Sequence, residues 1–550
     1  MATRKRTLSR VADSRTLDPD AVRAATREET LPVGLAAVVA GSIALAVSAL
    51  HGTMLLYGDA VAHLGIARGI LDSRHTGLAS LGGVWLPLPH LLMLPFVGRM
   101  DWWQNGMAGA WPSLICYVLS VMGMFCLARR VLAPRWALVA TAFFGLNANL
   151  LYLSTTAMTE PLFLALLVWM IVVLLEVREA IALENASAAT RRMVLLGLLI
   201  FAATMTRYDG WILGALVWCC VAYTLWKHVP MRSRVVTGLI VLTVLAVAGP
   251  LLWFWYNHVF GHDWLDFMRG PYSPAAIDRK TSPPGSHKYW GWHNPAWSLM
   301  LYARTAQVDA AWWETGWLLA AAALWGGWKA WQSRVDRATL LLWFPLPFYV
   351  YATAYSSVPI FIPQLYPHSF YNSRYGMELL PALALYGVYA LACLTKRLGA
   401  GRELAARVIA PVAGLLCVVN LFLMLHSTPL VLKEAMVNSR GRLAFQEPLA
   451  KQLESLPPGS TVLMENSDYV GALQAAAFPL KQTIGPNDYY GWKHGLTDPA
   501  DTANYIFATA GSDLAKAAKN HPDGLTELSI LCTSGQPCLR VYQSDRYKQP

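Results

Sequence analysis

Long apolar segments recur along this chain and constrain its fold more than any other feature. A helix needs about 20 apolar residues to cross the hydrocarbon core of a bilayer. Backbone polar groups cannot stay unpaired in lipid, so each such segment is expected to be a helix. Only 14% of the residues are charged, whereas a soluble domain carries about 25%. We therefore predict a mainly α fold, a polytopic membrane helical bundle. Its eleven predicted spans are 31–50, 106–127, 136–153, 158–176, 193–206, 208–226, 235–256, 311–328, 339–355, 376–395 and 408–427.

The basic residues predict the orientation of this bundle. Lys and Arg cluster in alternate short connections, and connections of this kind stay in the cytoplasm. Two predicted spans separate each cluster from the next, so all clusters share one side, and the odd number of spans places the C-terminus outside. The net charge of +11 thus reflects membrane topology and does not indicate nucleic acid. The clusters are Arg4/Lys5/Arg6/Arg10/Arg15/Arg23/Arg27, Arg129/Arg130/Arg135, Arg178/Arg191/Arg192, Lys227/Arg232/Arg234, Lys329/Arg334/Arg337 and Lys396/Arg397/Arg402/Arg407.

The chain divides into three predicted regions of an integral protein of the cytoplasmic (inner) membrane. Residues 1–30 are expected to be a cytoplasmic tail without regular structure. They are too long and too polar for the start of a cleaved signal peptide, so the span 31–50 is retained. Residues 31–428 form the transmembrane domain, and residues 429–550, where the composition turns soluble, form a small external α/β domain. The long external loops are 51–105, 257–310 and 356–375.

Shorter elements are predicted outside the spans. In the first external loop, an amphipathic segment at 60–71 and a Pro-punctuated apolar one at 84–95 suit helices that lie at the membrane interface. Cys532 and Cys538 lie in the external region, where two cysteines can form a disulfide. The external domain is expected to hold strands at 461–465, 505–508, 525–532 and 538–542 and helices at 443–455 and 512–519.

Polar side chains gather at the external ends of the predicted helices. Asp59 and His63 follow the first span, and Glu160 begins the fourth. The motif Arg207-Tyr208-Asp209 forms the turn between the fifth and sixth spans, and Arg374-Tyr375 precedes the tenth. Each of these groups taken singly also fits a helix cap or an interfacial anchor. Because several share one membrane depth beside long outer loops, we predict a common site.

Charge suggests the roles of these residues. The carboxylate of Asp59 can accept a proton from a hydroxyl nucleophile. The guanidinium of Arg207 or Arg374 can hold a phosphate leaving group with bidentate geometry. Glu160 and Asp209 are expected to orient His63 or Arg207, or to ligate a divalent metal.

The sequence does not decide whether a metal ion is bound. His63 and His90 add further potential ligands, but the chain shows no compact ligand spacing. The short cytoplasmic connections carry no nucleotide-binding fingerprint. A donor used on the outer face would therefore be lipid-linked or otherwise exported.

Five motifs together resemble the GT-C superfamily of integral membrane glycosyltransferases, close to the branch of bacterial protein-mannosyltransferases and lipid A aminoarabinose transferases. They cover roughly residues 31–390. The motifs are Gly58-Asp59, Pro87-Leu88-Pro89, Thr159-Glu160-Pro161-Leu162-Phe163, Thr206-Arg207-Tyr208-Asp209-Gly210-Trp211, and Arg374-Tyr375 before Leu379-Leu380-Pro381.

The resemblance implies an inverting transfer of a sugar from a polyprenyl-phosphate donor to a hydroxyl of a protein, lipid or glycan acceptor outside the cytoplasm. It implies Asp59 as the catalytic base, Glu160 as a second acidic site residue, and the arginines as ligands of the lipid phosphate. His63, His90, Tyr208, Asp209 and Tyr375 are the other expected substrate-binding residues.

Two departures from the family pattern bear on the substrate and on metal dependence. Ala60 stands where an acidic residue often follows the catalytic Asp, and His90 replaces an acidic residue in the outer loop.

Two other classes of function remain open from the sequence. A transporter or flippase for a lipid-linked glycan would carry ionisable groups near the membrane midplane and often internal repeats, whereas here the charges lie at one surface. A non-catalytic scaffold for envelope assembly would have no need of Asp59.

Overall fold

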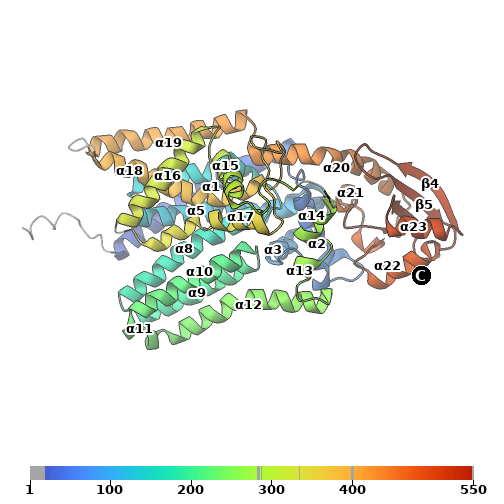
Figure 1. The fold of residues 1–550 in the computed structure, drawn as a ribbon, viewed down its shortest axis with the longest axis horizontal. Coiled ribbons are helices and arrows are strands. Elements are labelled where there is room, and N and C mark those ends of the chain that lie inside the picture. Colours follow the sequence, from blue (N-terminus) through green and yellow to red (C-terminus); the bar gives the residue numbers. More distant parts are fainter. Residues whose placement is uncertain (1–18, 282–284, 286–287, 334, 398–401, 548–550) are drawn as a thin grey trace, which may run out of the picture.

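The computed structural model of the chain describes residues 19–281, 285, 288–333, 335–397 and 402–547. Long helices run side by side through one half of the molecule, and a five-stranded sheet lies at the far end (Figure 1). A layer of short helices separates the two. The structure thus confirms a polytopic helical bundle with a small α/β unit near the C-terminus.

Within the described residues, eight helical segments are long and apolar enough to cross a membrane. They coincide with eight of the predicted spans. Their helices, as bounded in the structure, are α1 (Pro19–Leu50), α5 (Met107–Val131), α8 (Glu160–Ala182), α9 (Ala186–Thr204), α10 (Asp209–Lys227), α12 (Val236–Gly261), the 3₁₀ turn η3 (Ser373–Leu379) with α18 (Leu380–Arg397), and α19 (Arg402–His426).

Of the other three predicted spans, two are interrupted and the third is an unbroken helix of 18 residues. The segment 136–153 divides into α6 (Pro134–Gly145) and α7 (Ala148–Leu153), because the Asn147 side chain accepts hydrogen bonds from two backbone N–H groups and starts a new helix. The segment 339–355 divides into η2 (Arg337–Trp343) and α17 (Pro345–Tyr355) at a proline, which lacks a backbone donor. The third is α16 (Thr315–Gln332).

The first helix begins earlier than the sequence indicated. Residues 19–30 were expected in an irregular tail, but they extend α1 to Pro19. Ala, Glu and Arg are strong helix formers, and the helix can propagate outward from the apolar span without a new nucleus. The remainder of the predicted tail, residues 1–18, lies outside the described residues.

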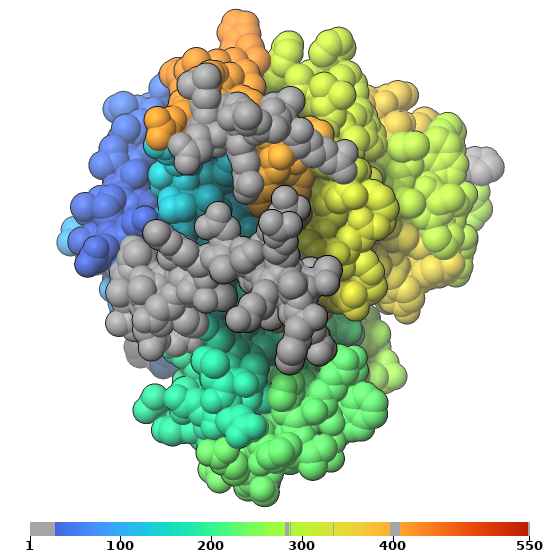
Figure 2. Space-filling view, turned by 90° about the vertical axis from the view of Figure 1, so that its left-hand side faces the viewer, coloured from blue at the N-terminus to red at the C-terminus, as the bar shows by residue number. Residues whose placement is uncertain are grey.

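The basic connections lie together at one end of the bundle. Ion pairs join connections that are distant in sequence: Arg129 pairs with Glu29 at 2.8 Å, Arg130 with Glu176 at 3.0 Å, and Arg178 with Asp336 at 2.8 Å. Figure 2 looks at this end and shows α9 to α12, in teal and green, as one group of helices beside the others. These pairs agree with a common side for the predicted cytoplasmic connections.

Short helices from the loops that the sequence predicts to be external cover the opposite end of the bundle. The two interfacial segments predicted in the first loop are helical, as α2 and α3. Leu64 and Ala67 of α2 are fully buried, so this layer is packed and not a loose covering. The elements of the layer are α2 (Gly58–Asp72), η1 (Leu78–Leu81), α3 (Leu88–Val97), α4 (Met100–Asn105), α13 (Asp266–Arg269), α14 (Pro274–Thr281) and α15 (Pro295–Ala310); α11 (Val229–Arg234) lies at the other end.

Helix α20 (Leu430–Glu454) leads from the bundle to the sheet, whose strand order is β2-β1-β3-β5-β4. Strand β1 runs parallel to β2 and β3, and β5 runs antiparallel to β3 and β4, with Ile506 opposite Tyr542. Cys532 and Cys538 form a disulfide in the β4–β5 turn. The elements are β1 (Val462–Met464), α21 (Val470–Ala475), η5 (Leu480–Gln482), β2 (Thr483–Ile484), α22 (Tyr489–Thr497), η6 (Pro499–Asp501), β3 (Tyr505–Thr509), α23 (Asp513–Asn520), β4 (Leu525–Leu531) and β5 (Leu539–Ser544).

The four predicted strands are present, and β2 was missed. It has two residues, which is too short for an alternating pattern to be visible. The predicted helix 443–455 is the second half of α20.

Close packing of α16 on α18 can be tested at Gly326. A Cβ atom there would lie 2.0 Å from the Tyr386 carbonyl oxygen, which belongs to backbone and cannot rotate away. Gly326→Ala should therefore destabilise the protein by about 1–3 kcal/mol, measured as a lower melting temperature in detergent. The matched control is Gly414→Ala in α19, where a Cβ meets no atom within 4 Å. Equal melting of the two variants would contradict this packing.

Candidate active site

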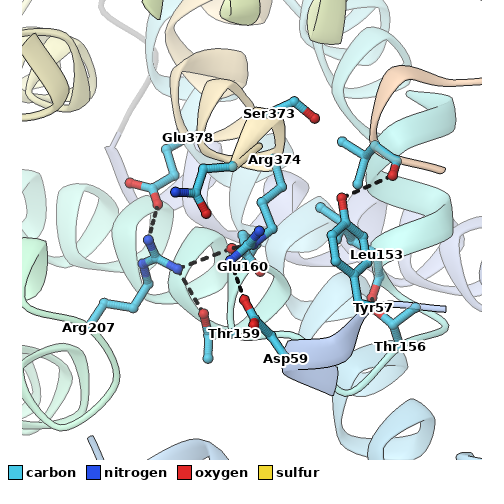
Figure 3. Close-up of polar contacts among 12 residues, drawn as sticks. Tyr57, Asp59, Leu153, Thr156, Thr159, Glu160, Arg207, Ser373, Arg374 and Glu378 are labelled. Carbon is cyan, nitrogen blue, oxygen red and sulfur yellow. Dashed lines mark hydrogen bonds and ion pairs between the residues drawn. The ribbon is translucent and has the colours of Figure 1, made fainter. Parts of the chain in front are cut away.

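Four segments that are far apart in sequence bring charged side chains together at one end of the bundle (Figure 3). Asp59, Glu160 and Asp209 each lie in the first turn of a helix, α2, α8 and α10 respectively. A carboxylate is stabilised there by the partial positive charge of the helix N-terminus. Arg374 enters from η3. The common depth predicted from the sequence thus corresponds to real contacts.

Arg374 joins two of these carboxylates. Its Nη2 donates to Asp59 Oδ2 at 2.6 Å, and its Nε donates to Glu160 Oε1 at 3.1 Å. The guanidinium is buried, and the rings of Tyr57 and Tyr375 lie within 5.4 Å of it. The side chain of Asp59 is 40% exposed, whereas that of Glu160 is fully buried. Asp59 is therefore held in orientation by a buried cation and remains accessible from outside.

Arg207 is the centre of a second set of contacts. Its Nη1 donates to Thr159 Oγ1 at 2.8 Å and to Glu160 Oε1 at 3.1 Å, and its Nε donates to Asp209 Oδ2 at 3.2 Å. Its Nη2 donates to the Tyr349 hydroxyl at 2.7 Å. All three nitrogens of the guanidinium already have protein partners. The phosphate-binding role expected for Arg207 stays a prediction.

Glu378 and Tyr349 belong to this cluster, although the sequence analysis did not single them out. Glu378 Oε1 lies 3.1 Å from Arg207 Nη2 and accepts a hydrogen bond of 2.6 Å from the Tyr349 hydroxyl. Both residues lie inside predicted apolar spans. An ionisable residue within a span is rare and usually functional, so Glu378 carried a signal that was available in the sequence. Tyr349 carried none.

The cluster contains more carboxylates than guanidinium groups. Asp59, Glu160, Asp209 and Glu378 face Arg207 and Arg374. Among the described residues, the second oxygens of Glu160 and Glu378 have no hydrogen-bond partner. Buried negative charge without compensation is costly. The second oxygens of Glu160 and Glu378 are therefore the places in this cluster where a further hydrogen-bond donor would be stabilising.

His63 of α2 and His90 of α3 form a hydrogen bond with each other, one helical turn away from Asp59. His63 lies one helical turn after Asp59 in α2, its Nδ1 is 2.8 Å from His90 Nε2, and its ring packs on Trp85 at 4.5 Å. Burial, together with the charges of Arg374 and Arg207, lowers the pKa of His63 from 6.5 to about 3. Burial and the charge of His63 lower the pKa of His90 as well. Both rings are therefore neutral near pH 7.

Tyr208 and Tyr375 occupy different surroundings. The Tyr208 hydroxyl donates to the carbonyl of Val84, and its ring stacks on Phe267, so it anchors the external loops beside the cluster. Tyr375 lies between the two guanidinium groups, 5.0 Å from each. A ring in this place stabilises both positive charges by cation–π attraction.

The described residues do not fit a metal site. They contain no group of three or more His, Cys, Asp or Glu side chains that could hold a metal ion. Asp59 and Glu160 are turned toward Arg374, and the two histidines toward each other. No chemical step below is assigned to a metal.

The histidine pair predicts how stability changes with pH. Between pH 6.5 and about 3, His63 binds a proton in the unfolded chain but not in the folded chain. Its contribution to stability is therefore complete above pH 6.5 and falls by up to about 1.4 kcal/mol per pH unit below it. The stability difference between wild type and His63→Gln should narrow as the pH falls from 6.5 toward 4. Thermal melts in detergent across this range measure it.

His521→Gln is the control for this measurement, because His521 is exposed. Its difference from wild type should stay constant with pH. A His63→Gln difference that also stays constant would contradict a neutral buried His63.

No family model and no curated protein matches the chain. Among solved structures, the crystal structure of ArnT from Cupriavidus metallidurans bound to undecaprenyl phosphate is similar to 92% of this chain and 99% of that one, at 15% sequence identity and a TM-score of 0.52. The apo state of ArnT is similar to 91% of this chain and 97% of that one, at 17% identity and a TM-score of 0.47.

A third structure, the Archaeoglobus fulgidus oligosaccharyltransferase in complex with Zn and sulfate, is similar to 90% of this chain and 72% of that one, at 12% identity and a TM-score of 0.43. The similarity to the undecaprenyl phosphate complex of ArnT extends over nearly all of both chains. The protein has the fold of the GT-C glycosyltransferases.

Proposed function

We propose that this protein is an inverting glycosyltransferase that moves a sugar from a polyprenyl-phosphate donor to an acceptor hydroxyl at the external face of the membrane. The observation that carries the proposal is the pair of Asp59 and Arg374, a part-exposed carboxylate held at 2.6 Å by a buried guanidinium. It combines the two groups that such a reaction needs, a proton acceptor and a cation.

Asp59 is the general base in this proposal. The acceptor hydroxyl oxygen attacks the anomeric carbon of the donor sugar, the bond from that carbon to the phosphate oxygen breaks on the opposite face, and Asp59 takes the hydroxyl proton. Its partner Arg374 binds Oδ2 of this carboxylate at 2.6 Å and so fixes the direction in which Asp59 faces the acceptor. General base catalysis of this kind contributes roughly 10²–10⁴-fold to the rate.

Arg374 and Glu160 complete the proposed centre. The phosphate of the departing lipid gains negative charge as the sugar leaves, and a nearby guanidinium stabilises that charge. Glu160, which is buried and bonded to Arg374 and Arg207, fixes the direction of both arginines. The ArnT complex with undecaprenyl phosphate supports a lipid phosphate as ligand of this fold.

The same proposal includes the orientation in the membrane. The basic connections would face the cytoplasm, and the Asp59 cluster and the sheet would face outward. A donor sugar linked to a membrane lipid reaches a site at that depth by diffusion in the outer leaflet. The transfer assay described next identifies the sugar. It also identifies the class of acceptor, whether a protein, a lipid or a glycan.

Asp59→Asn tests the base directly. Sugar transfer would be measured in membranes that contain the protein at matched expression, with a panel of radiolabelled polyprenyl-phosphate sugars and a native acceptor extract. Asn has nearly the same shape but cannot take the proton, so transfer should fall by about 10²–10⁴-fold.

Asp101→Asn is the matched control for this experiment. Asp101 lies in the same external loop, and its side chain is 60% exposed. Asp101→Asn should transfer sugar like wild type. Equal activity of Asp59→Asn and wild type would exclude Asp59 as the base. An inactive wild type across the panel would favour a transporter or a scaffold.

Arg374→Lys tests the geometry of the cation. Lys keeps the charge but has no planar fork, so it cannot hold Asp59 and Glu160 together. We expect turnover to fall roughly 10- to 100-fold in the same assay, while Arg99→Lys in the exposed Arg99–Asp101 pair has no effect. Unchanged turnover in Arg374→Lys would show that charge alone is sufficient.

A further inference from the structure

Helix α20 contacts both segments that carry the Asp59–Arg374 pair. It starts after α19 at the external end of the bundle and runs to the sheet (Figure 1). Two of its charged residues, Glu434 and Arg442, point back toward the bundle and are buried or half-buried. Neither has a part in the chemistry proposed above.

Glu434 holds the turn that carries Arg374. The Glu434 carboxylate is 2% exposed and accepts hydrogen bonds from the backbone N–H of Asn372 at 3.0 Å and of Ser373 at 2.7 Å. It also accepts one from the Ser373 hydroxyl, and its Oε1 lies 3.6 Å from Arg374 Nη1. It therefore satisfies the free N–H groups at the start of η3, as a capping residue from another helix would.

The backbone at this turn needs such support. Asn372 has a φ of +54°, in the left-handed region, which is uncommon for non-glycine residues although Asn adopts it more readily than most. A conformation of this kind persists where several contacts over-determine it. Without the carboxylate of Glu434, two buried donors next to Arg374 would lose their partner.

Arg442 holds the segment that leads into Asp59. Its Nη2 donates to the carbonyls of Leu55 at 2.8 Å and of Leu56 at 2.9 Å. Close by, the Tyr57 hydroxyl donates to the carbonyl of Val431 in α20 at 2.9 Å. Residues 55–57 immediately precede the first turn of α2. These contacts fix where α2 begins, and thereby where Asp59 lies.

The two contact points lie on one element. Glu434 and Arg442 are eight residues apart in α20, or about 12 Å along the helix axis. One end of this short rigid helix segment holds the turn of Arg374, and the other holds the approach to Asp59. The distance between base and cation thus depends on a helix that contributes no atom to either.

We infer that α20 is a positioning element, in which Glu434 and Arg442 set the placement of Arg374 and of Asp59. The inference rests on the proposed function for its effect on sugar transfer, but its structural effect can be measured without it. Both residues are positioning residues and touch neither substrate nor the reacting atoms.

The experiment compares pairs of identical substitutions in α20. Glu434→Gln removes one carboxylate oxygen and the charge, and its control is Glu447→Gln, whose side chain is 73% exposed. Arg442→Gln removes the bonds to residues 55 and 56, and its control is Arg440→Gln at an exposed position. For each protein in detergent, hydrogen exchange of residues 372–375 and 55–59, the melting temperature, and kcat and KM for sugar transfer are measured.

The expected result is local. Exchange should rise at 372–375 in Glu434→Gln and at 55–59 in Arg442→Gln, and kcat should fall roughly 10- to 100-fold with little change in KM. The controls should match wild type. A residue that only stabilises the fold would lower the melting temperature without this split between kcat and KM.

Each other outcome has a distinct meaning. If both variants exchange and turn over like their controls, α20 has no positioning role. If exchange rises but kcat does not change, the positioning of the pair is not needed for transfer, and the inference fails. If the wild type transfers no sugar, the proposed function fails, and the exchange contrast alone decides the structural claim. Because the two variants act on opposite sides of the site, either can carry the test if the other does not fold.

Discussion

The buried guanidinium of Arg374 is the contact on which the architecture of the site depends. It draws Asp59 from the first external loop and Glu160 from α8 to one point. A buried cation without its carboxylates would cost several kcal/mol, so the three residues require one another. The helices that carry them must end at the same depth for these bonds to form.

Further hydrogen bonds and ion pairs surround this contact. Arg207 links Glu160 to Asp209 and, through Tyr349, to Glu378, so the base is supported by a network and not by a single ion pair. The neutral pair of His63 and His90 joins α2 to α3 without adding charge to the site. The exposed side of Asp59 is where this buried network meets solvent.

The fold was largely predictable because apolar length and basic connections are one-dimensional signals. Eight of the spans match long helices, and the exceptions have local causes, such as the cap at Asn147 and the proline at 345. The site was partly predictable, since Asp59, Glu160, Arg207 and Arg374 each interrupt an apolar pattern at a helix end. Tyr349 and the anchoring of Tyr208 away from the centre were not, because aromatic residues at a membrane surface give no sign of what they face.

The sequence by itself determined that this chain is a helical membrane protein with charged residues gathered at one end of its helices, because hydrophobic length and charge placement act on each segment separately. Only the tertiary structure decided which charges meet. Arg374 could have paired with any carboxylate at that end, and the pairing with Asp59 follows from how α2, α8 and η3 pack and from the contacts that Glu434 and Arg442 make from α20. Those contacts join residues between 61 and 387 positions apart, and no local pattern in a sequence records them.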